Sequence, residues 1–457
     1  MTAAERAFDV VVIGAGPAGE VCAGRLAEGG LEVAIAEREL VGGECAYWAC
    51  MPSKALLRPA ELLAETGRVP GVREAVSGPL DVEAVLRRRD EVVHALDDAS
   101  QLPWLEREGI ALLRGHARIE GERRVRVGDE VVEARQAVVI ATGSGTLLPP
   151  IPGLAEARPW GSREVTTAHA APARLIVLGG GVVGVEMAQA WASLGSAVTL
   201  VEALPRLLPR EEPFAGEQVA EALHERGVDV RTGSAVTAAA RSDGEVRLTL
   251  EDGADAAGDE LVVAVGRRPR THDMGLEQVG LEPGATIEVD DRLRVPGNGW
   301  LYAIGDVNGR TLLTHMGKYQ ARIAADNVLG ADVAATEDGP TAPRVVFTDP
   351  QVAAVGHTLE SAEEAGLDVR AVDHPIAAVA GASFYGRDAA GTARLVVDED
   401  RRVLVGATFT GPEVADLLHA ATIAVVAEVP LERLWHAVPS FPTRSEVWLR
   451  LMEHYGL

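Results

Sequence analysis

The chain has little cysteine, almost no lysine and no long apolar run. Three cysteines in 457 residues are too few for the disulfide framework of a secreted protein and favour a reducing compartment. No apolar stretch approaches the roughly 20 residues of a membrane-spanning helix, and the N-terminus does not resemble a signal peptide. We therefore expect a cytoplasmic protein without membrane insertion. A net charge of -25 argues against nucleic acid or anionic lipid as a partner.

Arginine supplies nearly all of the positive charge. Only Lys54 and Lys318 among the 43 basic residues are lysines. A lysine at position 54 therefore indicates a need for a compact ammonium group, which the planar guanidinium of arginine does not provide. The length predicts two to four domains, and 47% hydrophobic with 24% charged residues is typical of a globular chain.

An internal repeat is the strongest sign of organisation. The segments "DVVVIGAGPAGEVCAGRLAEGGLEVAIAE" and "RLIVLGGGVVGVEMAQAWASLGSAVTLVE" each place three glycines between an apolar strand and a helix, with a glutamate ending the next strand. Every member of the second set lies 165 positions after its counterpart in the first. The two sets are Gly14, Gly16, Gly19 and Glu37, and Gly179, Gly181, Gly184 and Glu202.

This pattern predicts two dinucleotide-binding units. The first glycine permits the tight turn, the second lets the backbone approach a pyrophosphate at the helix N-terminus, and the third lets helix and strand pack closely. FAD and a nicotinamide dinucleotide are the simplest pair of ligands for the two units. Glu202 would repel a ribose 2′-phosphate and so favours NADH, whereas Arg206 and Arg210 keep NADPH open.

Two further strand-to-glycine segments flank the second unit. "VVIATGS" (138–144) and "LVVAVGR" (261–267) are interpreted as the exit from the first domain and the return to it, so the second nucleotide domain is an insertion. "GWLYAIGDVNG" then predicts a strand ending in Gly305 and Asp306. An acidic residue there suits a polyhydroxyl chain such as the ribitol of a flavin, although a solvated turn is equally compatible.

In this order the motifs resemble those of the FAD-dependent pyridine nucleotide-disulfide oxidoreductases, a family that includes lipoamide dehydrogenase, glutathione reductase and mercuric reductase. The resemblance also covers "GGECAYWACMPSK", "VGRRP", "VVFTDPQVAAVG" and "FPTRSE". It implies an α/β protein with two Rossmann-like domains, the NAD domain inserted in the FAD domain, and a C-terminal α+β dimerisation domain. The expected boundaries are 1–150 and 271–342 for the FAD domain, 151–270 for the NAD(P) domain and 343–457 for the interface domain.

The resemblance also implies roles for individual residues. Cys50 would face the flavin as the charge-transfer thiolate, Cys45 would exchange with the acceptor, and Lys54 would lie near the flavin and pair with Glu186. The expected FAD-lining residues beyond the first glycine loop are Lys54, Ala117, Thr142, Gly143, Ser144, Asp306, Leu312, Leu313, Thr314 and His315. Val236, Gly266 and Glu186 would join the second glycine loop around the nicotinamide cofactor. A homodimer is implied, with the active site completed by the partner's C-terminal segment.

The cysteine spacing itself predicts irregular backbone. Positions five apart in a regular helix rise about 7.5 Å, beyond the roughly 7 Å Cα separation that a disulfide tolerates. Cys45 must therefore lie in an irregular first turn, which Gly42 and Gly43 permit and Pro52 loosens further. No second closely spaced Cys or His pair completes a zinc site, so we expect no bound metal. An inert disulfide is disfavoured, because the flavin motif gives the bond an electron source.

The C-terminal motif departs from the family. Disulfide reductases end in His-Pro-Thr-x-x-Glu, and here Phe441 stands at the histidine position, followed by Pro442, Thr443 and Glu446. Phenylalanine can neither stabilise the exchange thiolate nor protonate a leaving thiol, a contribution worth roughly 10²- to 10⁴-fold. His436 is a possible substitute base, although its use would break the register of the motif.

A second departure lies within the cysteine loop. Tyr47 and Ala49 replace the usual Asn and Gly, which indicates either an altered acceptor pocket or altered packing. Mercuric reductases also lack the histidine but usually carry a C-terminal cysteine pair, which is missing here.

The sequence therefore predicts a flavoprotein that passes electrons from NAD(P)H, with NADH favoured, through FAD to a Cys45/Cys50 disulfide. The small-molecule acceptor would be atypical: a quinone, a soft metal ion or an unusual disulfide. Two alternatives stay open, a lipoamide dehydrogenase with a substitute base and a redox sensor or complex subunit with incidental turnover.

Overall fold

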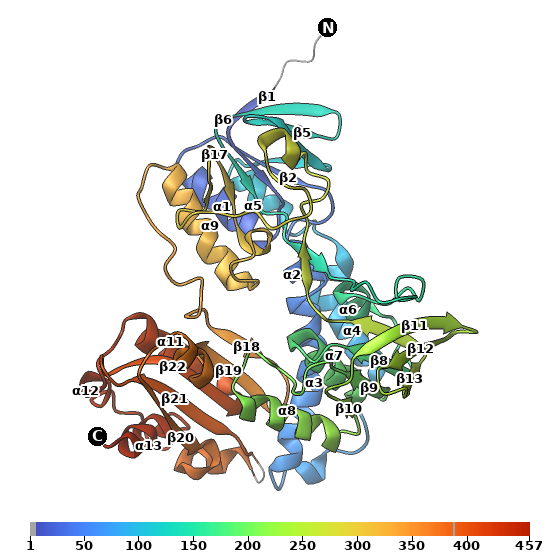
Figure 1. Ribbon diagram of the computed structural model, residues 1–457, viewed down its shortest axis with the longest axis vertical. Helices are drawn as coiled ribbons and strands as arrows, with labels where there is room; N and C mark the ends of the chain where they lie inside the picture. Colours follow the sequence, from blue (N-terminus) through green and yellow to red (C-terminus); the bar gives the residue numbers. More distant parts are fainter. Residues whose placement is uncertain (1–5, 387–388) are drawn as a thin grey trace. The chain divides into compact units, whose positions relative to one another are not determined.

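The computed structural model describes residues 6–386 and 389–457, and the chain divides into two compact units (Figure 1). Each unit combines three separate chain segments. The first unit contains Met1–Pro52, Asp90–Thr146 and Arg267–Gly339, and the second contains Ser53–Arg89, Leu147–Gly266 and Pro340–Leu457. The four domain boundaries drawn from the sequence stay a prediction.

The first unit is built on an eight-stranded sheet. Its main path runs β16-β17-β6-β1-β2-β3, and the hairpin strands β4 and β5 attach through β6. Strands β1, β2, β3, β6 and β17 are parallel neighbours, the arrangement of a doubly wound nucleotide-binding domain. The bounds are β1 Arg6–Ile13, β2 Val33–Glu37, β3 Ala111–Arg114, β4 Ala117–Gly121, β5 Arg124–Val127, β6 Glu130–Ile140, β16 Arg294–Val295 and β17 Asn298–Ala303.

Successive side chains of β1 enter two different cores. Val10 and Val12 pack beneath α1 (Pro17–Glu28) and α9 (Thr314–Val328), which lie side by side over the sheet (Figure 1). Val11 and Ile13 enter the core on the opposite face. Alternation of this kind follows from the pleat, and burial on both faces explains the continuous apolar run in the sequence.

Two short strands join the first unit to the inserted segment of the chain. Strand β7 (Ser144–Thr146) pairs antiparallel with β15 (Arg267–Pro269), so the chain leaves and re-enters this unit at one place. The exit and return expected from "VVIATGS" and "LVVAVGR" therefore lie beside each other. Strand β17 ends at Ala303, earlier than expected, because Gly305 at φ 73° begins a 3-10 turn, Gly305–Asn308.

The second unit contains a smaller parallel sheet in the order β10-β9-β8-β14 and a three-stranded antiparallel sheet, β11-β12-β13. Their bounds are β8 Arg174–Leu178, β9 Ala197–Val201, β10 Asp229–Arg231, β11 Val236–Ser242, β12 Glu245–Leu250, β13 Asp255–Gly258 and β14 Glu260–Val263. Helices α7 (Val182–Ser193) and α8 (Pro213–Glu225) pack on the parallel sheet. This is the second copy of the nucleotide-binding unit.

The C-terminal part of the second unit is an antiparallel sheet in the order β18-β19-β22-β21-β20. Apolar side chains of α11 (Leu418–Val426) and α13 (Glu446–Tyr455) cover one face of it. The strands are β18 Arg344–Val346, β19 Gln351–Gly356, β20 Val369–Pro375, β21 Thr392–Asp398 and β22 Val403–Gly411. The predicted α/β fold class, with an α+β C-terminal domain, is confirmed.

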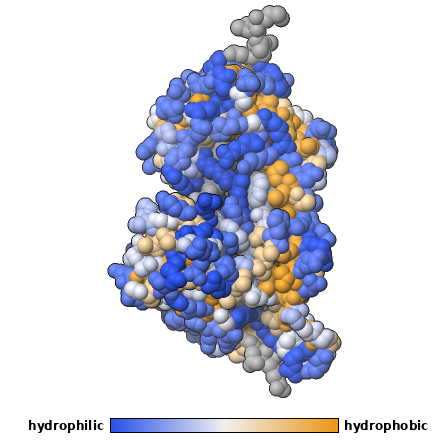
Figure 2. All heavy atoms as spheres, turned by 90° about the vertical axis from the view of Figure 1, so that its right-hand side faces the viewer, coloured by the Kyte–Doolittle hydropathy of each residue, from blue (hydrophilic) through white to orange (hydrophobic). Residues whose placement is uncertain are grey.

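The remaining named helices connect these layers. They are α2 Gly43–Tyr47, α3 Cys50–Arg68, α4 Val82–Val92, α5 Leu102–Arg107, α6 Ser162–Thr167, α10 Leu359–Glu364 and α12 Leu431–Leu434. Among the described residues, no helix is both long and apolar enough to span a membrane. The face drawn in Figure 2 is largely hydrophilic with apolar patches between, as expected for a net charge of -25.

Candidate functional site

The sequence repeat is also a repeat in space. Gly14 and Gly179 adopt φ of 105° and 114°, and a Cβ at either would lie 2.5 or 2.6 Å from a backbone carbonyl oxygen. Gly19 and Gly184 pack against the start of their own loops, since a Cβ there would lie 1.9 or 1.8 Å from the carbonyl oxygen of Gly14 or Gly179. Only glycine fits at these four positions.

The terminal glutamates repeat one hydrogen-bond pattern. Glu37 accepts the backbone N–H of Ala15 at 2.8 Å, and Glu202 accepts that of Gly180 at 2.5 Å. Each carboxylate is thereby held beside its own glycine loop, at the end of the second strand. An oxygen acceptor at that place suits the hydroxyl groups of an adenosine ribose.

Each loop also leaves its helix N-terminus open. A Cβ built at Gly16 or Gly181 would meet no atom within 4 Å, and neither residue caps its helix with a side chain. Unpaired N–H groups at the start of a twelve-residue helix favour an anion such as a pyrophosphate. The residues of both loops therefore fit the pyrophosphate of a dinucleotide, and the assignment of FAD to the first loop and NAD(P)H to the second stays a prediction.

Asp306 is held at the first loop's sheet edge by two neighbours. Ser144 Oγ donates to its carboxylate at 2.5 Å, and Arg267 Nε lies 2.6 Å from Ser144 Oγ and 3.6 Å from the carboxylate. Ser144 and Arg267 belong to β7 and β15, so the carboxylate expected to bind ribitol is fixed by the strands that lead to the inserted segment. Binding of the ribitol by this carboxylate stays a prediction.

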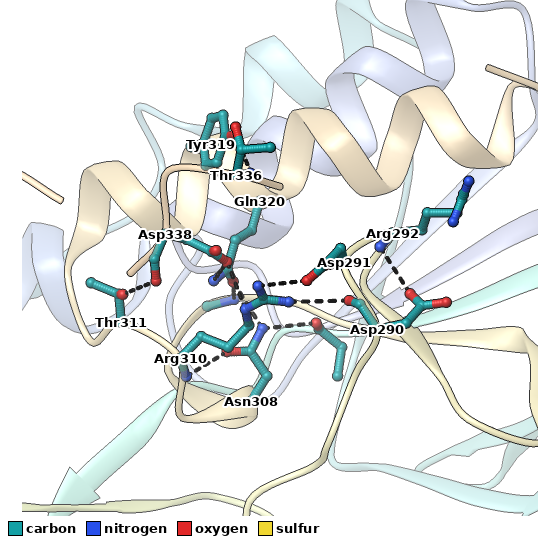
Figure 3. Close-up of polar contacts among 12 residues, drawn as sticks. Asp290, Asp291, Arg292, Asn308, Arg310, Thr311, Tyr319, Gln320, Thr336 and Asp338 are labelled. Atoms are coloured by element: carbon teal, nitrogen blue, oxygen red, sulfur yellow. Dashed lines mark hydrogen bonds and ion pairs between the residues drawn. The ribbon is translucent and has the colours of Figure 1, made fainter. Parts of the chain in front are cut away.

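A buried polar network fixes the loop between β17 and α9 (Figure 3). Gln320, fully buried, accepts the N–H of Gly305 at 2.8 Å and a side-chain N–H of Asn308 at 2.9 Å. Its own amide donates to Asp338 at 2.9 Å, and Arg310 Nε lies 3.0 Å from the same carboxylate. This network therefore holds the turn containing Asp306 and the following loop in one conformation.

The two cysteines predicted to be redox-active, Cys45 and Cys50, lie on different helices. Cys45 is in the five-residue helix α2, and Cys50 begins α3 after a break in which Trp48 adopts φ -132°. The irregular backbone expected from the spacing is present, although the sequence did not predict two separate helices. Thr314, at the start of α9, places its Oγ1 3.3 Å from Cys50 Sγ.

The reduced pair is electrostatically asymmetric. Both residues are free cysteines. A hydrogen bond with Cys50, burial, and the charge of Cys50 raise the pKa of Cys45 above its ordinary value, while Thr314 and Lys318 act in the opposite direction. Cys45 therefore holds its proton more tightly than an ordinary thiol, and the roles expected for the two cysteines stay a prediction.

Lys54 and Glu186 form an ion pair within the second unit. Lys54 Nζ lies 2.8 Å from Glu186 Oε2 and 4.6 Å from the centre of the Phe347 ring. Glu186 is 3% exposed and its other oxygen accepts the N–H of Phe347 at 3.0 Å. The ammonium group is thereby held between the Glu186 carboxylate and the Phe347 ring, and its place near the flavin stays a prediction.

The C-terminal motif does not present an acid–base pair. Phe441 is 75% exposed, and His436 is also exposed. Glu446 is buried and accepts the backbone N–H of Gly381 at 3.2 Å. Its carboxylate thus contributes to the structure of the C-terminal part.

The other residues predicted to bind the cofactors lie at the ends of strands or around the start of α9. In the first unit these are Ala117 at the start of β4, Thr142 and Gly143 after β6, and Leu312, Leu313 and His315 around the start of α9. In the second unit, Val236 begins β11 and Gly266 follows β14 with φ 151°. Sequence reasoning missed Arg267, which "VGRRP" contained, and the Arg310 network, for which no local pattern exists.

The chain matches known proteins over most of its length. Residues 8–325 match the family model described as pyridine nucleotide-disulphide oxidoreductase, and residues 342–452 match its dimerisation domain. The chain is 33% identical over 460 residues to a dihydrolipoyl dehydrogenase of Haloferax volcanii, covering 98% of this chain and 96% of the relative. It is 30% identical to a mercuric reductase of Staphylococcus aureus, covering 96% of this chain and 81% of the relative.

A solved structure is similar over its whole length. The Cu(II) complex of the HOCl-induced flavoprotein disulfide reductase RclA from Escherichia coli superposes with a TM-score of 0.87 at 29% identity. The match covers 98% of this chain and 99% of that one. Among the described residues, no group of three or more His, Cys, Asp or Glu side chains is arranged to hold a metal ion.

Proposed function

The chain belongs to the pyridine nucleotide-disulphide oxidoreductases, FAD-dependent enzymes that use NAD(P)H, and from this premise we propose that it passes electrons to an acceptor other than a standard exchanging disulfide. NADH is the proposed donor, because Glu202 stands where a 2′-phosphate would bind. The cytoplasm is the proposed location.

Each part of the chain has a defined task in this proposal. The first glycine loop, Glu37 and Asp306 hold FAD, and the second loop with Glu202 holds the nicotinamide dinucleotide. Bound FAD would supply the two-electron relay between the nicotinamide and the cysteine pair. Lys54, fixed by Glu186, provides a positive charge beside the flavin, and Cys50 receives electrons while Cys45 meets the acceptor.

The observation that carries the proposal is Phe441 at the histidine position. Reduction of an ordinary disulfide by Cys45 releases a thiol, which needs a proton donor. Phe441 has none to give, and Glu446 is committed to the backbone of Gly381. The dimerisation domain would bring this segment to the partner's cysteine pair, so the completed site would still lack the acid.

A thiophilic metal ion is the acceptor that fits best. It binds to two thiolates and accepts electrons without a thiol leaving group, so the missing acid carries no penalty. One NADH supplies two electrons, enough to reduce two Cu(II) ions to Cu(I). The relatives support this choice, since one is a mercuric reductase and RclA was solved as a Cu(II) complex.

An acceptor panel under anaerobic conditions tests the proposal. Wild type, Cys45→Ser and Cys50→Ser are each given NADH with Cu(II), Hg(II), a quinone or lipoamide, and NADH oxidation is followed. We expect metal-dependent oxidation that both cysteine substitutions abolish. Quinone turnover that survives Cys45→Ser would assign the acceptor site to the flavin instead. Rapid lipoamide turnover through the cysteines would support the lipoamide dehydrogenase alternative, and no turnover with any acceptor would support the sensor alternative.

A further inference from the structure

An ion pair connects the residue before Cys45 to the segment that follows β15. Arg270 Nη2 donates to Glu44 Oε1 at 2.5 Å, and the two side chains are 25% and 16% exposed. Both residues lie in the first unit, although they are 226 positions apart in the chain. Neither residue belongs to the predicted nucleotide or cysteine machinery.

The helix that carries Cys45 needs support from outside itself. Helix α2 has five residues, begins at Gly42 and Gly43 with φ of 110° and 60°, and has no side-chain cap at its N-terminus. Helices of this length are not stable alone. Tyr47, which is fully buried, anchors one side of α2, and the ion pair of Glu44 supplies a second anchor.

Arg270 is itself held against the first unit's exit strand. Its backbone N–H donates to the carbonyl of Gly143 at 2.9 Å. A Cβ built at Gly145 would lie 3.5 Å from Nε of Arg270, so the side chain runs over this glycine. The guanidinium therefore sits between β7 and α2, next to residues expected to line FAD.

Charges on other elements also act on Cys45. The charge of Cys50 on α3 raises the pKa of Cys45, and the charge of Lys318 on α9 lowers it. Glu20 on α1 lies near Lys318. Glu44 on α2 precedes Cys45 directly and pairs with Arg270, which follows β15. The pair is neutral, so removing either member leaves one unbalanced charge at the helix that carries Cys45.

We propose that Glu44 and Arg270 form a charge-balanced clamp that positions α2 and sets the dithiol–disulfide equilibrium of Cys45 and Cys50. The clamp rests on the proposed redox role of the cysteine pair. Loss of Arg270 leaves a carboxylate that disfavours the negatively charged reduced pair and favours the disulfide. Loss of the Glu44 charge leaves a cation that favours the reduced pair.

The equilibrium is measured against dithiothreitol in the oxidised holoenzyme. Dithiothreitol gives two electrons and two protons to the Cys45–Cys50 disulfide, yielding two protein thiols and cyclic oxidised dithiothreitol, so the exchange is balanced. Samples equilibrated anaerobically in dithiothreitol mixtures are quenched with acid, denatured and alkylated with N-ethylmaleimide, and their intact mass is recorded. Cys22, the third cysteine, adds one constant label.

The two charge removals should act in opposite directions. We expect Glu44→Gln to shift the equilibrium constant about 3- to 10-fold toward dithiol and Arg270→Gln by a similar factor toward disulfide, where tenfold equals 29.6 mV for two electrons. The double variant should return to within about twofold of wild type, and Arg270→Lys should stay near wild type because the charge is kept. A role limited to stability would instead move both single variants in the same direction.

Matched controls use an exposed pair in the same unit. Arg292 and Asp332 lie 2.5 Å apart and their side chains are 43% and 75% exposed. Arg292→Gln and Asp332→Asn change the net charge as the test variants do and should leave the equilibrium unchanged. If Arg270→Gln does not fold, the other two variants still test the proposal. Glu44→Gln should shift the dithiol–disulfide equilibrium constant, whereas Arg270→Lys should leave it unchanged.

The outcomes separate the clamp from the proposed function. Single variants that shift together, or not at all, would overturn the clamp while the cysteine pair still titrates. Failure of the wild type to form a reversible disulfide would overturn both the clamp and the proposed function.

Discussion

Glu20, in the first turn of α1, is a partly buried carboxyl group with an unusual proton affinity. Burial raises its pKa from 4.5 to about 7, Lys318 opposes that shift, and Glu37 adds to it. The folded state therefore binds this proton more tightly than the unfolded state. As the pH rises from about 4.5 to 7, ionised Glu20 costs the fold stability, and above 7 the cost is constant.

Replacing Glu20 should remove this cost. Glu20→Gln is expected to raise the free energy of unfolding at pH 8 by up to about 3 kcal/mol, and by much less at pH 5. Denaturant unfolding of both proteins at the two pH values checks this. An equal change at pH 5 and pH 8 would show that the carboxyl group does not titrate in this range.

The chain has only two lysines, Lys54 and Lys318, and both contact or act on groups predicted for the site. Lys54 forms the ion pair with Glu186 and lies over Phe347, and Lys318 acts on Cys45 and Glu20. In a chain that otherwise uses arginine, both lysines are therefore placed among groups proposed for the site. The sequence pointed to Lys54 through its motif, but not to Lys318, because that role depends on α9 lying beside α1 and α2.

Within the second glycine loop, Gly184 is needed for close packing, whereas Gly181 faces open space. A methyl group at Gly184 would collide with the carbonyl oxygen of Gly179, whereas one at Gly181 would meet no protein atom. The space over Gly181 is where the cofactor's pyrophosphate is proposed to bind. The two glycines therefore provide a matched pair of substitutions three positions apart.

Gly184→Ala should lower the melting temperature, because overpacking of a close contact costs roughly 1–3 kcal/mol or more. Gly181→Ala should leave the melting temperature within about 2 °C of wild type, consistent with no more than about 0.5 kcal/mol, while weakening NADH binding at least about tenfold. Thermal unfolding and NADH titration distinguish them. Unchanged NADH affinity in Gly181→Ala would contradict the placement of the dinucleotide.

In the loop between β17 and α9, the Arg310 guanidinium forms an ion pair with the buried carboxylate of Asp338. The side chain of Asp338 is 2% exposed, and Arg310 and Gln320 contact it (Figure 3). Arg310→Met would leave that carboxylate without its charged partner, which typically costs about 3–5 kcal/mol.

The expected destabilisation can be compared with that of an exposed pair. Arg292→Met should change the free energy of unfolding by less than about 1 kcal/mol. Urea unfolding of both variants measures the difference, and the release of FAD reports whether the loop before α9 has loosened. Equal stability of the two variants would show that the buried network contributes no more than the exposed ion pair.

Local sequence patterns predicted the glycine loops but not the long-range side-chain contacts. The glycine loops and the strands around them follow from residues close together in sequence, so the repeat was visible at once. The Arg310 network depends on residues spread from Asp290 to Asp338, and the Glu44–Arg270 pair joins positions far apart. Neither could be predicted, because side-chain pairing across a fold leaves no periodic signal.

At the scale of the whole molecule, the chain contains two nucleotide-binding sheets and a C-terminal domain that matches a dimerisation domain. The ordered motifs were sufficient to predict this architecture. They could not identify the acceptor, because that depends on the segment around Phe441 and on its proposed place beside the partner's cysteines.

The proposed function depends on Phe441 at the usual histidine position, which is expected to make ordinary disulfides poor acceptors. Steady-state NADH oxidation with lipoamide, compared between wild type and Phe441→His, tests it most directly, with the Cu(II)-dependent rate as the internal reference. We expect slow lipoamide turnover in wild type, a gain of at least about tenfold in Phe441→His, and little change with Cu(II). Rapid wild-type turnover with lipoamide that Phe441→His does not improve would contradict it.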